Sequence, residues 1–242
     1  MDAKRMNVGI FIPSCVDQYW PQTGINLIAL LRRLGYTCFY PDQLTDSGQV
    51  LYMKGDREGA KDLGQRMINA YRDCDYVVSC GSGDVAYAKR FFGELFFNTA
   101  SHNECHRLAD KMYDVSDFLV HVAHYTPTDV TFPHRVVFMD HCRTLRDYGL
   151  HDEPRQLLSA VNGLELLELS HPGVCCGKDF VLSNLFEPIS TEMARQKVDD
   201  ALHVGAQYLV GTEPSCLLHL KSYIEQVGLN LQCKHLVDIL AV

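Results

Sequence analysis

RVVFMDHC, the stretch from Arg135 to Cys142, joins a short apolar run to a polar turn that ends in a cysteine. An apolar run of this length, rich in β-branched and aromatic residues, is typical of a buried strand. The first half of the chain contains the same arrangement, because the run Asn7–Ile12 ends at Pro13-Ser14-Cys15. Cys15 and Cys142 are 127 residues apart, which indicates an internal repeat.

Other segments recur at nearly the same separation. The matching pairs are Asp46-Ser47-Gly48 with Cys175-Cys176-Gly177, Gly59–Tyr71 with Thr191–His203, and Asp84 with Cys216. Strand, turn and helix follow one another in the same order in both copies. We therefore predict two homologous halves, residues 1–126 and 127–242, joined by a linker near Tyr125–Pro133.

Both halves alternate short apolar runs with amphipathic helical stretches. This alternation predicts the α/β class, with two homologous three-layer α/β halves and mainly parallel sheets related by pseudo-two-fold symmetry. In such folds the loops at the carboxyl ends of the strands build the functional sites. We expect four cysteines of the second half to meet at one sheet edge: Cys142, Cys175, Cys176 and Cys216.

Four thiolates are suited to tetrahedral zinc or to an iron–sulfur cluster. The spacing lacks paired C-x-x-C knuckles, so spacing alone leaves a metal site and four unrelated buried cysteines both open. Neighbouring residues in a strand point to opposite faces, so Cys175 and Cys176 must lie on a turn, which Gly177 permits. We interpret four other cysteines as small apolar residues: Cys38, Cys74, Cys105 and Cys233.

Composition limits the class of protein. The net charge is -8 and Lys and Arg are scattered, so we expect no nucleic-acid partner. No run approaches the roughly 20 apolar residues of a transmembrane segment. Ten cysteines are compatible with a reducing, cytoplasmic location, where thiols stay free.

The sequence resembles the CCG (cysteine-rich) domain family, in particular its members of the lactate-utilisation protein A and glycolate-oxidase iron–sulfur type; a component of heterodisulfide reductase is a more distant relative. The residues that carry the likeness are Leu34-Gly35, Tyr40-Pro41, Asp152-Glu153-Pro154, Gly163–Leu167, Cys175-Cys176-Gly177 and Pro214–Leu218. The resemblance implies an iron–sulfur cluster of [4Fe–4S] type, with zinc as the alternative, held by Cys142, Cys175, Cys176 and Cys216. It also implies a ferredoxin-type iron–sulfur partner subunit and a further lactate-utilisation subunit.

The chain departs from the family pattern at several positions. Glu213 replaces the fifth cysteine of the long motif, and we expect it to be a surface carboxylate. In the first half Asp46, Ser47 and Asp84 replace cysteines, and only Cys15 remains. Three interpretations of that half stay open: a site that lost its metal, a mixed Cys15/Asp46/Asp84 metal site, and a pocket for a small polar ligand. The pocket would use Ser47, Ser82 and the amides of Gly81 and Gly83.

Histidines beside the cysteines, His141 and His171, are either hydrogen-bond donors to the thiolates or exposed loop residues. The group His102, His106, His121 and His124 is interpreted as a solvated helix face. Three functions compete. The chain is an electron-transfer subunit in the oxidation of L-lactate or a related 2-hydroxy acid, a zinc-stabilised binding subunit, or a thiol protein with a Cys175–Cys176 switch.

Overall fold

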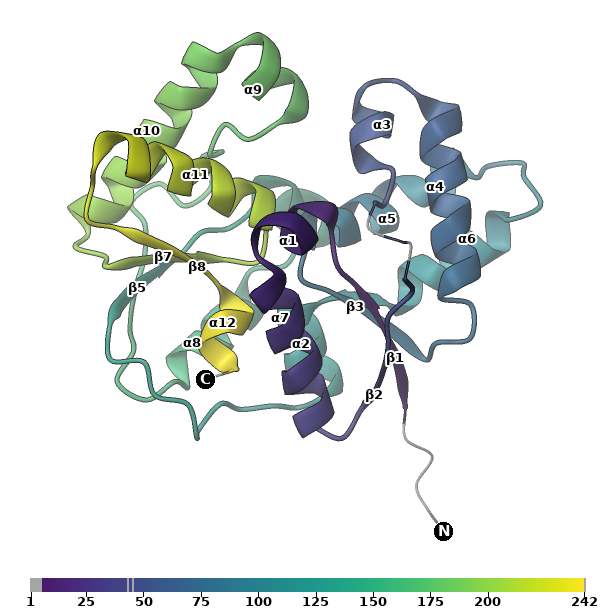
Figure 1. Cartoon of the computed structure of the whole chain (residues 1–242), viewed down its shortest axis with the longest axis horizontal. Coiled ribbons are helices and arrows are strands. Elements are labelled where there is room, and N and C mark those ends of the chain that lie inside the picture. Colours follow the sequence, from purple (N-terminus) through teal and green to yellow (C-terminus); the bar gives the residue numbers. More distant parts are fainter. Residues whose placement is uncertain (1–5, 43, 45, 242) are drawn as a thin grey trace.

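The computed structural model describes residues 6–42, 44 and 46–241, and it contains two four-stranded parallel sheets. The first sheet has the order β2-β1-β3-β4, and its strands are β1 (Asn7–Phe11), β2 (Thr37–Phe39), β3 (Tyr76–Ser79) and β4 (Met112–Asp114). The second has the order β6-β5-β7-β8, and its strands are β5 (Arg135–Phe138), β6 (Glu165–Leu167), β7 (Tyr208–Gly211) and β8 (Gln232–His235). The same strand order in both sheets confirms the predicted α/β class and the repeat (Figure 1).

Helices cover both sheets. In the first half they are α1 (Ser14–Tyr19), α2 (Pro21–Arg33), α3 (Gln49–Met53), α4 (Arg57–Ala70), α5 (Ser82–Leu95), α6 (His102–Lys111), α7 (Val115–Asp117) and the π-helix η1 (Phe118–Val122). In the second they are the π-helix η2 (Thr144–Tyr148), α8 (Asp152–Ser159), α9 (Phe180–Leu185), α10 (Glu187–His203), α11 (Pro214–Val227) and α12 (Leu236–Leu240). None of the helices in the described part of the chain is long and apolar enough to cross a membrane.

Three apolar cores hold these layers together. One lies between the first sheet and α4, α5 and α6, and another lies between the second sheet and α10 and α11. The third is shared, because Ile10 and Leu27 of the first half pack in the same cluster as Val136 and Leu236 of the second. Helices α2 and α12 lie side by side in this shared layer (Figure 1). The division at residues 126 and 127 therefore crosses a common core, and it stays a prediction.

Matching positions of the repeat perform the same local task. Asp114 ends β4, and its carboxylate accepts a hydrogen bond from the Ser116 amide at 2.8 Å, which caps α7. His235 ends β8, and its Nδ1 accepts from the Val237 amide at 3.1 Å, which caps α12. Both side chains satisfy an amide that a helix start leaves unpaired. The strand-to-helix junction is thus preserved although the two residues differ.

Candidate metal centre

The structure brings the four predicted cysteines together at the carboxyl ends of three neighbouring strands. Cys142 follows β5, Cys175 and Cys176 lie in the loop between β6 and α9, and Cys216 lies in the first turn of α11 after β7. Strand β5 pairs with both β6 and β7, so the three loops are adjacent. These residues therefore meet at one sheet edge, and their binding of a metal stays a prediction.

The four sulfurs are linked by successive contacts, and we call this set of four cysteines the row. Sγ of Cys142 lies 3.6 Å from Sγ of Cys175, and the Cys176 thiol lies within hydrogen-bonding reach of both Cys175 and Cys216. Cys176 and Cys216 are buried, whereas Cys142 and Cys175 are half-buried, so one end of the row faces the surface. The four sulfurs do not all lie within 4.8 Å of one another. Among the described residues, the groups of three or more ligand atoms that meet this criterion lie elsewhere.

Gly177 gives the cysteine pair its turn. Its φ is +88°, a left-handed conformation that favours glycine, and a Cβ there would lie 2.6 Å from the carbonyl oxygen of Ser190 on α10. The Ser190 hydroxyl donates to the Gly177 carbonyl at 3.0 Å, and the Gly177 amide donates to Sγ of Cys175 at 3.4 Å. The turn is therefore fixed against α10 and directs an amide hydrogen at a sulfur.

Hydrogen bonds among these thiols shift their pKa values in opposite directions. Hydrogen bonds from the Cys142 and Cys176 thiols lower the pKa of Cys175 below its ordinary value. The same bonds, followed by burial, raise the pKa of Cys142, and bonds with Cys175 and Cys216 raise the pKa of Cys176. Cys216 lies in the first turn of α11, which begins at Pro214.

A buried lysine holds the loop that leads to the cysteine pair. Lys197 on α10 is only 2% exposed, and its Nζ donates to the carbonyl oxygens of His171 at 3.1 Å and Pro172 at 3.2 Å. Burial lowers the pKa of Lys197, and the nearby acidic groups and thiols oppose that shift. This side chain ties the loop to α10 and puts a cation near the sulfurs.

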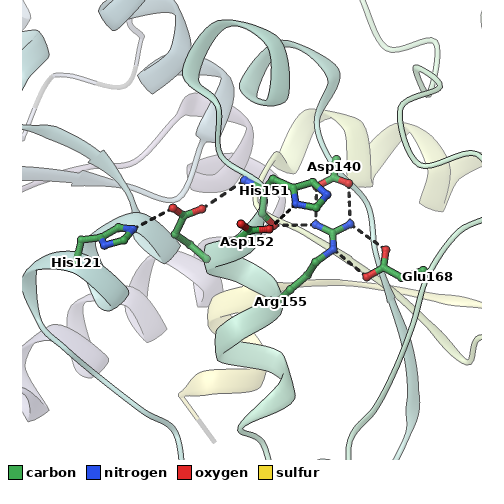
Figure 2. Close-up of polar contacts among 7 residues, drawn as sticks. His121, Asp140, His151, Asp152, Arg155 and Glu168 are labelled. Atoms are coloured by element: carbon green, nitrogen blue, oxygen red, sulfur yellow. Dashed lines mark hydrogen bonds and ion pairs between the residues drawn. The ribbon is translucent and has the colours of Figure 1, made fainter.

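Arg155 on α8 joins the ends of β5 and β6 (Figure 2). Its Nη1 and Nη2 donate to the two carboxylate oxygens of Asp140 at 2.9 and 2.8 Å, and its Nε and Nη2 donate to Glu168 at 2.8 and 3.0 Å. The Asp140 side chain is 1% exposed. Asp140 precedes Cys142 by two residues, and Glu168 begins the loop toward Cys175, so Arg155 sets the spacing between two cysteine-bearing loops.

Glu213 corrects one of our expectations. It is 7% exposed and not a surface carboxylate. Its Oε2 accepts from the Gly83 amide of the first half at 2.7 Å, and its Oε1 accepts from the Ser215 hydroxyl at 2.7 Å. Glu213 caps the start of α11 and contacts the other half. Its carboxylate can be buried because both of its oxygens accept hydrogen bonds.

The groups predicted to line a polar pocket in the first half make hydrogen bonds within the protein. The Gly83 amide binds Glu213, the Gly81 amide binds Ser79, and the Ser47 hydroxyl donates to Asp84 at 2.5 Å. The Thr144 hydroxyl donates to Ser82. Each group predicted to bind a ligand thus has a hydrogen-bond partner elsewhere in the protein, and the pocket stays a prediction.

The ligand atoms of the predicted Cys15/Asp46/Asp84 metal site do not all lie close together. Cys15 lies near Asp84 and Glu213, and burial followed by those carboxylates raises its pKa. Asp46 instead accepts from the amide of Gly48 in its own turn at 2.8 Å. Cys15, Asp46 and Asp84 are not a group of ligand atoms within 4.8 Å of one another in the described chain. A site that lost its metal and kept its fold stays a prediction for this half.

The histidines divide into separate environments. His141 is half-buried and its Nδ1 bonds the Thr144 hydroxyl at 2.7 Å, whereas the side chain of His171 is 74% exposed. His121 lies against Glu153 at 3.0 Å (Figure 2). His102 and His106 lie together on α6, beside Cys105. His106 and His121 are exposed, as expected of a solvated face, and the separation of the two groups depends on tertiary packing.

Comparison with known proteins agrees with this geometry. Residues 136–221 match the model of the CCG family, described as a cysteine-rich domain, and this segment contains all four cysteines of the row. Lactate utilization protein A of Geobacillus thermodenitrificans (strain NG80-2) is 31% identical over 236 residues, which cover 97% of this chain and 98% of that protein. Lactate utilization protein A 1 of Bacillus cereus (strain AH820) is similar to the same extent. The chain belongs to the lactate utilization protein A family.

A solved structure supports the fold alone. A hypothetical protein from Helicobacter pylori matches with a TM-score of 0.71 at 8% sequence identity. The match covers 97% of this chain and 48% of the other, so this chain spans about half the length of that protein.

Proposed function

We propose that this chain is an iron–sulfur subunit of a complex that utilises L-lactate or a related 2-hydroxy acid, and that it relays electrons through Cys142, Cys175, Cys176 and Cys216. The observation that carries the proposal is the convergence of these four thiols at adjoining strand ends. The name of the relatives supplies the substrate class, because they are lactate utilization proteins matched over nearly their whole length.

The donor set fits such a centre, because four soft thiol ligands suit iron–sulfur clusters and zinc alike. A [4Fe–4S]-type cluster, when bound, supplies one-electron transfer. The chain contributes the ligands, the Gly177 amide aimed at a ligand sulfur, and the Lys197 cation that offsets thiolate charge. Hydrogen bonds to sulfur and local charge are the means by which a protein sets the potential of a cluster.

A partner surface adjoins the sulfur row. Apolar side chains exposed on the loop and on α9 and its flanks are Val174, Phe180, Leu185, Phe186 and Ile189. Exposed apolar side chains gathered at one place mark interaction sites. We assign this surface to the ferredoxin-type iron–sulfur partner subunit, because electron transfer over a short distance requires the partner to dock beside the centre. The proposal also includes the further lactate-utilisation subunit and a cytoplasmic location.

Zinc is the second candidate, and the distance between the Cys142 and Cys175 sulfurs favours it. A tetrahedral site with Zn–S bonds of about 2.3 Å separates its sulfurs by roughly 3.8 Å. The Cys142 and Cys175 sulfurs are 3.6 Å apart, close to that value. In this alternative the thiols bind a redox-inert ion that holds the loops together and presents the partner surface.

Anaerobic purification separates the two candidates. We expect a brown protein that contains iron and acid-labile sulfide and bleaches on reduction, and we expect Cys216→Ser to lose both elements. Cys233→Ser is the matched control, since Cys233 lies in the same half outside the row. A colourless protein that loses zinc in Cys216→Ser establishes the zinc alternative. Equal metal content in the two variants overturns the whole site.

A further inference from the structure

A second group of soft ligands lies in the first half, on α6. His102, Cys105 and His106 occupy positions i, i+3 and i+4, which share one face of a helix. One nitrogen from each imidazole and the Cys105 sulfur all lie within 4.8 Å of one another. Helix α6 lies far from α9, α10 and α11, which surround the cysteine row (Figure 1).

The neighbouring helix α5 leaves room for this group. Gly93 faces His106, and a Cβ at that position would lie 2.9 Å from Cε1 of the His106 ring. The Cys105 thiol is fully buried and donates to the His102 carbonyl at 2.9 Å and to the Phe92 carbonyl at 3.5 Å. The two imidazole rings meet nearly at right angles, with centroids 4.8 Å apart.

One atom of the group is left without a partner. Nδ1 of His102 is buried and has no hydrogen-bond partner among the residues that the structure describes. Buried polar atoms are nearly always paired, so an exception calls for an explanation such as an ion. The Cys105 hydrogen is already accepted by backbone carbonyls, and the ring of Phe97, edge-on to His102 with centroids 6.0 Å apart, offers no polar partner.

We propose that His102, Cys105 and His106 form a metal site for Zn²⁺, separate from the cysteine row. Imidazole and thiolate select zinc over Mg²⁺ and Ca²⁺, which require oxygen ligands. Cys105 binds as a thiolate and releases its proton to solvent. Three protein ligands leave the fourth position to water, and His106 is exposed, so that position is open to solvent. All three ligands lie on α6, so the ion cross-links the first turn of that helix.

The test compares two exposed helix histidines. Zinc binding is measured by equilibrium dialysis and chelator competition on the whole chain, under reducing conditions, for wild type, His106→Gln and His203→Gln. His203, at the end of α10, is the matched control. We expect one zinc ion per chain to bind about 100-fold or more weakly in His106→Gln and unchanged in His203→Gln, since loss of a ligand costs more than loss of an outer partner.

Cobalt gives the second readout. Co²⁺ bound at this site is expected to show a thiolate charge-transfer band that Cys105→Ser removes, while Cys216→Ser leaves it in place. The site fails if His106→Gln binds as much zinc, as tightly, as wild type, or if His203→Gln weakens binding equally. Failure of the cysteine row shows only in Cys216→Ser, so the two outcomes are distinguishable.

Discussion

Arg155→Met is expected to destabilise the second half strongly, because it leaves a buried carboxylate without its cation. Asp140 is 1% exposed and receives two hydrogen bonds from Arg155, whereas Glu168 is 53% exposed. Breaking a buried pair by removing one partner costs about 3–5 kcal/mol. The exposed pair with Glu168 adds no more than about 1 kcal/mol.

Urea unfolding of metal-free, reduced protein measures this effect. With a slope of about 2 kcal/mol/M, the expected loss lowers the midpoint by roughly 2 M. Glu168→Gln is the control, and we expect less than about 1 kcal/mol from it. The double variant Asp140→Leu with Arg155→Met removes both charges together, and we expect it to recover most of the loss, because an apolar pair can replace a buried ion pair.

The same variants separate stability from site geometry. Arg155 spans the strand ends that lead to Cys142 and Cys175, so Arg155→Met should also bind metal roughly 10–100-fold more weakly, as for loss of an outer partner. The reasoning is refuted if Arg155→Met is no less stable than Glu168→Gln, or if the double variant is as unstable as the single one.

Three further predictions follow from the same contacts. Gly177→Ala should lower the free energy of unfolding by about 1–2 kcal/mol or more and reduce metal content, because Gly177 has a positive φ and a Cβ there would lie against the Ser190 carbonyl. Gly173→Ala is the control in the same loop, because a Cβ at Gly173 meets open space. We expect it to change neither the urea midpoint nor the metal content. Lys197→Met should weaken metal binding about 10-fold or more by releasing two loop carbonyls, and unchanged affinity in chelator competition would contradict this. Burial raises the pKa of Asp114 to about 7, so its contribution to stability is present below pH 4 and lost as the pH rises through 7. Asp114→Asn should therefore flatten the dependence of the urea midpoint on pH between 4 and 8, while Asp110→Asn should leave that dependence as in wild type.

The sequence was sufficient to predict the fold and the position of the sulfur row. Periodic apolar runs and a repeat of about 127 residues predicted two parallel sheets, and the loops after β5, β6 and β7 carry the cysteines as expected. These features follow from local patterns and from the general behaviour of parallel sheets. The sequence also predicted that Cys175 and Cys176 lie on a turn, since adjacent side chains cannot otherwise reach one centre.

The sequence did not allow us to predict which side chains pair between segments that are distant along the chain. Arg155 resembles an ordinary helix charge, yet it binds Asp140, 15 residues earlier, across two strand ends. His102 and His106 resemble solvated residues, because nothing local shows that Gly93 of α5 makes space beside them. Burial of a polar side chain depends on which groups the tertiary fold places opposite it, and that information is not contained in periodicity.

Glu213 links the two halves of the chain. A carboxylate at this position cannot add a soft ligand to the row, but it can accept hydrogen bonds, and it accepts one from Gly83 of the other half. In the first half, Asp84 accepts a hydrogen bond from the Ser47 hydroxyl. Burial, followed by the charge of Glu213, raises the pKa of Asp84 to about 8. Glu213 therefore binds the second half to the first, whereas Ser47 and Asp84 pair with each other within the first half. Of the two halves, only the second has four cysteines at the carboxyl ends of its strands.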